Sequence, residues 1–157
     1  MAVSPLRPIA ELATNLRNGE TTAVALLEKC LDRIASHDPS LNAYISVMAD
    51  SARDRAAEAD RELARGHDLG SVHGIPVSVK DMIDIKGVPT TAGSRVRSGH
   101  LAEHDATIVA RLRARGAVLI GKCNLHEFAF GTTGEDSAFG PTRNPVSLDR
   151  IPGGSSS

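Results

Sequence analysis

Two short apolar segments, separated by a helical pattern, most constrain how this chain folds. They are residues 75–80 (IPVSVK) and 117–123 (AVLIGKC), and each is typical of a strand buried in a parallel sheet. Between them, residues 105–116 (DATIVARLRARG) predict a helix with Asp105 as its N-cap and Gly116 at its end. A strand, a crossover helix and a second strand form a βαβ-like unit, whose connection we expect to be right-handed.

The first third of the chain is predicted to be mainly helical. Helical patterns cover residues 8–18, 21–39 and 50–66, and a short strand pattern covers residues 42–48. We expect Thr21 or Thr22 to cap the second helix and Pro39 to end it. The chain is therefore predicted to be α/β, with N-terminal helices over residues 1–65 and the start of an α/β core over residues 66–157.

Composition excludes several classes of function. Lysine and arginine together number 18 and aspartate and glutamate 19, so the net charge of −1 gives no broad attraction to nucleic acid or an anionic membrane. No apolar run approaches the roughly 20 residues of a membrane-spanning helix. Cys30 and Cys123 are far apart and outside any CxxC pair, which favours free thiols over a disulfide or a zinc site. We expect a soluble, cytoplasmic protein.

Lys80 is the first candidate for chemistry, because it ends the apolar segment 75–80. Strand alternation places Ser78 and Lys80 on one face, and burial there would lower the pKa of the lysine and leave a neutral amine able to act as a general base. Alternatively, the strand ends at Lys80, and the side chain extends to water or pairs with Asp81. Spacing alone leaves both interpretations open.

The terminal sequence PGGSSS has two interpretations as well. It is neither a Walker phosphate loop nor a G-x-S-x-G nucleophile elbow, and a flexible Gly/Ser tail explains the composition. Two glycines before a serine can also hold an unusual backbone that presents the Ser155 hydroxyl. The six histidines lack metal-ligand spacing, and His126 and Glu127 are adjacent, so their side chains diverge on a helix and predict no metal site.

Four motifs occur in order: GIPVSVKDMIDIKGVPTTAGS, DATIVARLRARGAVLIGKCNLHEFAFG, SAFGPTRNP and PGGSSS. Together they resemble the amidase signature family, serine hydrolases that cleave amide C–N bonds through a Ser–cis-Ser–Lys triad and an acyl-enzyme. The resemblance covers about residues 5–157. It implies a mixed β-sheet flanked by helices, a small-molecule amide substrate, and no cofactor or metal.

The resemblance also implies roles for individual residues. Lys80 matches the catalytic lysine, and Ser155 matches the serine that follows a cis peptide bond and relays a proton between that lysine and the nucleophile. The remaining implied positions are the acyl pocket at Phe130, Gly131 and Thr132, the cis-serine loop at Gly153, Gly154 and Ser156, and the structural TRNP turn at Arg143, Asn144 and Pro145.

The sequence departs from the family pattern after the relay serine. The nucleophilic serine and the oxyanion-hole motif of the family lie in a later Gly-rich stretch that is absent from these 157 residues, and Ser157 stands where glycine is common. If the chain is complete at Ser157, we expect it to be inactive alone and prone to aggregate through unpaired strand edges.

Three functional hypotheses remain open from the sequence. The chain is part of a stand-alone amidase, which forms a homodimer or acts alone. It is part of the glutaminase subunit of a tRNA-dependent amidotransferase, with the other amidotransferase subunits as partners. Or it is a truncated non-catalytic module. NLHEFAFG resembles the broader amidase set more than the NMDEFAMG form common in the transamidase family members.

Overall fold

The computed structural model describes residues 7–157. Its elements follow the predicted order. The helices are α1 (Ile9–Arg17), α2 (Ala23–Leu41), α3 (Ala49–Ala64) and α4 (Thr107–Ala114), and the strands are β1 (Tyr44–Val47), β2 (Pro76–Lys80) and β3 (Val118–Cys123). Two short 3₁₀ turns, η1 (Arg95–Arg97) and η2 (Glu127–Ala129), lie in the loops.

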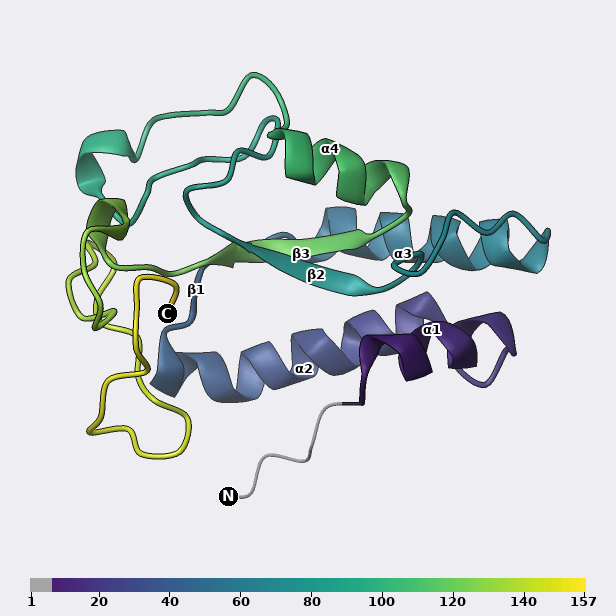
Figure 1. Cartoon of the computed structure of the whole chain (residues 1–157), viewed down its shortest axis with the longest axis horizontal. Coiled ribbons are helices and arrows are strands. Elements are labelled where there is room, and N and C mark those ends of the chain that lie inside the picture. The colour runs from purple at the N-terminus through teal and green to yellow at the C-terminus, as the bar shows by residue number, and fades with distance from the viewer. Residues whose placement is uncertain (1–6) are drawn as a thin grey trace.

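The three strands form one mixed sheet with β3 in the centre. β2 runs parallel to β3, as the βαβ-like pattern predicts, and β1 pairs antiparallel on the other side of β3. In Figure 1, α1 and α2 lie on one side of the sheet and α4 on the other. The predicted α/β class, a mixed sheet flanked by helices, is confirmed.

Apolar side chains on the two faces of the sheet form two cores. The larger core joins α1, α2 and α3 to the strands, and its buried members are Leu16, Ala23, Leu27, Leu31, Ala52, Ala56, Ala59, Ile75, Val118 and Ile120. The smaller core joins α4 to the strands through Val79, Ile85, Val109 and Leu119. Helix α3 contributes only alanines to the buried set because its packed face lies against the α2 helix and β3.

A register irregularity changes which side chains share a face. The pairing of β2 with β3 shifts between Val77 and Ser78, after which Val79 pairs with Lys122 and Lys80 pairs with Cys123. A Cβ on Gly121 would lie 2.6 Å from the Ser46 carbonyl oxygen, so only glycine fits at this point in β3. As a result, Lys80 and Lys122 project from opposite faces of the sheet.

The prediction that Pro39 ends the second helix is wrong. Helix α2 continues through Pro39 to Leu41, and Asn42 ends it in a left-handed conformation with φ of 54°. Proline removes one helical N–H, but the next bonds still form: Asn42 donates to the Asp38 carbonyl at 2.8 Å. The Asp38 carboxylate then accepts from the Ala43 N–H at 2.6 Å and secures the turn into β1.

The predicted N-cap at Asp105 is also wrong. Helix α4 begins one residue later, Ala106 occupies the N-cap position, and no side chain caps the helix. Asp105 instead accepts a hydrogen bond from the Lys86 N–H at 2.7 Å and pairs with Arg113 Nε at 2.9 Å. Its carboxylate therefore holds the loop after β2 against α4.

Candidate active site

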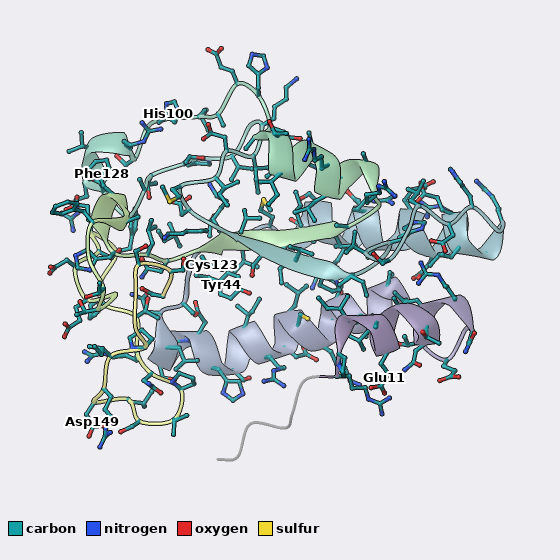
Figure 2. The ribbon with its side chains drawn as sticks, in the orientation of Figure 1. Glu11, Tyr44, His100, Cys123, Phe128 and Asp149 are labelled. Carbon is teal, nitrogen blue, oxygen red and sulfur yellow. The ribbon has the colours of Figure 1, made fainter. Side chains whose placement is uncertain are left out.

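Lys80 is the last residue of β2 and lies partly buried at the end of the strand. Its register partner Cys123 is the last residue of β3, so the carboxyl-terminal ends of both parallel strands lie side by side at one end of the sheet. Figure 2 labels Cys123 and Tyr44 beside this end of the strands. The carboxyl edge of a parallel pair is where side chains of α/β proteins commonly meet a ligand.

The C-terminal segment folds back onto this edge. His126 donates its N–H to the Ser155 carbonyl at 3.2 Å, and Leu125 forms an isolated antiparallel bridge with Ser156. Figure 1 shows the yellow end of the chain returning beside β1, close to where the strands end. PGGSSS is therefore an ordered part of the fold, and the interpretation as a flexible tail is wrong for residues 152–157.

The structure brings Lys80 and Ser155 together across 75 residues of sequence. Lys80 Nζ donates to Ser155 Oγ at 2.7 Å, and the peptide bond between Gly154 and Ser155 is cis. Burial lowers the pKa of the Lys80 amine from its ordinary value, because the charged form loses hydration. The alternative pairing of Lys80 with Asp81 does not occur, since the Asp81 carboxylate lies against Lys122.

Glycine is required at the residue before Ser155. A Cβ on Gly154 would lie 2.6 Å from the Thr132 carbonyl carbon and 2.8 Å from the Thr133 nitrogen. Both are backbone atoms, which can move only if the loop around them shifts. Gly153 adopts φ of 103°, a conformation that residues with a side chain rarely reach. The two glycines thus let the loop pass tightly against residues 132–133.

The TRNP turn closes the loop that precedes Ser155. Asn144 donates from its side-chain amide to the Ile151 carbonyl at 3.1 Å and accepts from the Val146 N–H at 2.9 Å. The Arg143 N–H reaches back to the Leu41 carbonyl at the end of α2 at 2.8 Å. These bonds tie both ends of residues 144–151 together and anchor the loop to the helical part of the chain.

The residues implied for the acyl pocket lie in two settings. Phe130 is 89% exposed and lines an open depression of about 730 Å³ together with His126, Glu127, Phe128, Asp136, Ser137 and Ala138. Gly131 and Thr132 are not part of that lining. Gly131 instead passes the His126 ring so closely that a Cβ would lie 2.2 Å from it, and Thr132 packs against Gly154.

Sequence reasoning missed a buried ion pair next to Lys80. Lys122 is fully buried in β3, and its Nζ lies 2.7 Å from Oδ1 of the equally buried Asp81. The signal was present in the sequence: a lysine stands inside the apolar strand AVLIGKC, and a buried charge of this kind needs a partner. Adjacency in sequence had suggested Asp81 only as a partner for Lys80.

Within residues 7–157 there is no group of three or more His, Cys, Asp or Glu side chains that could hold a metal ion. Glu127 does not pair with His126. The ring Nε2 of His126 lies 3.5 Å from Asp136 instead. Both cysteines are free thiols. None of the helices in this part of the chain is long and apolar enough to cross a membrane.

A family model described as Amidase matches residues 25–157, most of the chain. The chain belongs to the amidase signature family. Among sequence relatives, the glutamyl-tRNA(Gln) amidotransferase A subunit of Renibacterium salmoninarum is 48% identical over 146 residues, which is 93% of this chain and 28% of the relative.

Two solved structures share the fold. A native peptide amidase from Stenotrophomonas maltophilia has a TM-score of 0.86 at 39% identity. The matched segment makes up 94% of this chain and 32% of the peptide amidase. A chain from a vestigial protein complex, described as revealing the origins of an s-triazine catabolic enzyme, has a TM-score of 0.91 at 40% identity, with 96% and 33% coverage. This chain thus spans about a third or less of the length of these relatives.

Proposed function

We propose that this chain is the N-terminal part of an amide-hydrolysing enzyme in which Lys80 is the general base and Ser155 relays the proton. The contact between Lys80 Nζ and Ser155 Oγ at 2.7 Å supports this assignment most directly. The lowered pKa of Lys80 favours the neutral amine, which is the form able to accept a proton.

In the proposed reaction, neutral Lys80 accepts a proton through the Ser155 hydroxyl from a second serine. That serine attacks the amide carbonyl carbon and forms a tetrahedral intermediate, whose oxyanion is stabilised by backbone N–H groups. The C–N bond then breaks, and the proton returns through Ser155 to the leaving amine or ammonia. Water hydrolyses the resulting acyl-enzyme to the free acid by the same relay.

Other residues take supporting roles in this proposal. Gly153, Gly154 and Ser156 hold the loop that presents Ser155, and Phe130, Gly131 and Thr132 lie beside the acyl group. No residue among these 157 matches the nucleophilic serine motif of the family. We therefore propose that residues 1–157 alone do not turn over amides.

The test combines this chain with a polypeptide that carries the nucleophilic serine motif. The purified 157-residue protein is incubated with simple aliphatic and aryl amides, alone and after co-expression with the remaining two-thirds of a homologous amidase as a separate polypeptide. We expect no ammonia or amine release alone, and release by the assembled pair. In the pair, Lys80→Ala and Ser155→Ala should each reduce kcat/KM by about 10³-fold or more, while the exposed Lys86→Ala should not.

Turnover by the 157-residue protein that Lys80→Ala abolishes would contradict the proposed need for further residues. Equal activity of the Lys80→Ala pair and the unsubstituted pair would contradict the proposed base.

The sequence relative named above favours a second candidate within the same chemistry. Its name is that of an amidotransferase component, which makes the glutaminase of a tRNA-dependent amidotransferase the alternative, with the other subunits as partners. The assembled pair separates the two candidates by substrate. Ammonia release from glutamine in preference to simple amides would favour the glutaminase, and the reverse preference would favour the stand-alone amidase.

A further inference from the structure

The buried pair of Lys122 and Asp81 lies directly behind the proposed base. Beside its 2.7 Å approach to Asp81, Lys122 Nζ donates to the Pro89 carbonyl at 3.1 Å and to Thr90 Oγ1 at 3.0 Å. The other oxygen of Asp81 accepts from the Thr91 N–H at 2.9 Å and from the Thr91 hydroxyl. Both charged groups are thus fully enclosed and held by several partners.

The two lysines are separated by the sheet. Asp81 is the first residue of the turn after β2, and its N–H donates to the Cys123 carbonyl at 2.9 Å. Lys80 shares its face with its register partner Cys123, and Lys122 shares the other face with Val79. The Asp81 carboxylate therefore meets Lys122 on one face, while the Lys80 amine meets Ser155 on the other.

The titratable neighbours of Lys80 at this end of the sheet include Cys123, Tyr44 and Asp38. Cys123 on β3 and Tyr44 on β1 are neutral, since burial raises the pKa of each above its ordinary value. Asp38 of α2 is the carboxylate on this side, and its Oδ1 already accepts from the N–H groups of Ala43 and Tyr44. Asp81, the next residue in the chain, is the carboxylate best placed to favour the charged form of Lys80.

We propose that Lys122 is a positioning residue for the amide-hydrolysing site: its positive charge compensates the Asp81 carboxylate behind the sheet, so that no net negative charge beside Lys80 favours the protonated amine over the form that serves Ser155. The inference rests on the proposed role of Lys80 as the base. An opposite charge near an amine favours its protonated form, and a like charge disfavours it. Removing either member of the pair should therefore change the protonation of Lys80 in a sign that charge alone determines.

The experiment measures the protonation of Lys80 directly in the 157-residue chain. The rate of acetylation of Lys80 is followed by peptide mass spectrometry as a function of pH, because only the neutral amine reacts. Lys122→Met leaves the Asp81 charge without its counter-ion and should raise the pH midpoint of Lys80 acetylation by about one unit. Asp81→Asn leaves Lys122 unpaired and should lower the midpoint. The double variant should return it to the unsubstituted value.

These opposite signs distinguish the proposed role from a purely structural one. Loss of packing would hydrate Lys80 in either variant and raise its midpoint in both. Lys86→Met, which removes an exposed lysine, serves as the control for surface charge, and circular dichroism establishes that each variant is folded. If Lys122→Met does not fold, the lowered midpoint in Asp81→Asn still decides the question.

An unchanged or raised midpoint in Asp81→Asn, or an unchanged midpoint in folded Lys122→Met, would overturn the inference. The assay needs no turnover, so it fails separately from the proposed function. If the acetylation midpoint of Lys80 is low in the unsubstituted chain and is the same in both variants, only the role of Lys122 is contradicted. An ordinary lysine midpoint in the unsubstituted chain contradicts the proposed base itself.

Discussion

The Ser155 hydroxyl reaches Lys80 because Gly154 has no side chain where the backbone of Thr132 and Thr133 passes. We predict that Gly154→Ala destabilises the protein by about 1–3 kcal/mol, since the added Cβ would lie 2.6 Å from a backbone atom and the loop must shift. The free energy of unfolding from urea denaturation measures the effect. Gly99→Ala is the matched control, because a Cβ there meets nothing within 4 Å.

A free energy of unfolding for Gly154→Ala equal to that of Gly99→Ala would show that residues 132–133 move aside easily. The close passage would then have no role in placing Ser155.

A second set of buried polar groups connects α3 to the loop before β2. His73 is fully buried, accepts from the Leu69 N–H at 3.1 Å, and contacts Glu62 through Nε2 at 2.8 Å. The ring therefore carries its proton on Nε2 and donates it to Glu62. The hydrogen bond from Arg55 at 2.6 Å, with a smaller contribution from His73, holds the pKa of Glu62 below its ordinary value.

This geometry predicts a pH dependence of stability. A carboxylate with a lowered pKa stabilises the fold above its unfolded-state pKa of 4.5, and that stabilisation is lost as pH falls through the lower folded-state value. We expect Glu62→Gln to be less stable than the unsubstituted protein at about pH 6 and the difference to narrow below pH 4.5. Urea denaturation at a series of pH values measures both, with Glu58→Gln, a more exposed carboxylate on α3, as the control. A gap that stays constant down to about pH 3.5 would contradict the linkage.

At the scale of the element, the Thr22 side chain caps the start of helix α2. The Thr22 hydroxyl accepts from the Ala25 N–H at 3.0 Å and satisfies one of the unpaired donors at the start of the helix. We predict that Thr22→Ala lowers the free energy of unfolding by about 1 kcal/mol. Thr21→Ala is the control, because the structure gives the cap to Thr22. Equal losses in thermal or urea denaturation would contradict the assignment.

The elements also show where sequence signals mislead. The apolar residues of α2 recur at every helical turn, and those of β3 form a continuous short run. Several residues therefore support each prediction, and both elements were predicted. Pro39 and Asp105 are single signals near helix ends, and each was outweighed by tertiary partners. The Asp38 carboxylate secures the end of α2, and Arg113 and the Lys86 N–H bind Asp105 away from the start of α4.

At the scale of the whole molecule, the helical first third and the sheet share one core. Leu27 of α2 and Val118 of β3 belong to the same buried cluster, which also includes residues of α1 and α3. We therefore predict a single cooperative unfolding transition. Far-UV circular dichroism follows the helices, and fluorescence of Tyr44, the one tyrosine in a chain without tryptophan, follows β1 and the sheet. The two urea curves should coincide.

Separate midpoints for the two probes would show that the helices and the sheet around Tyr44 unfold as distinct units. Coincident curves in Leu27→Ala, with a midpoint lowered by the loss of about 2–5 kcal/mol, would strengthen the case for one unit.

The sequence alone determined the identity and order of the helices and strands, and the residues that match the family motifs, because periodicity and local motifs depend on near neighbours. The family resemblance implied a proton relay between Lys80 and Ser155, but the residues themselves gave neither the contact between these groups, 75 residues apart, nor the pairing of Asp81 with Lys122 instead of Lys80. Those contacts depend on the register shift at Gly121 and on the return of the C-terminal loop to the strand ends. Only the folded chain brings such distant groups to hydrogen-bond distance, and only there does burial lower the pKa of the Lys80 amine.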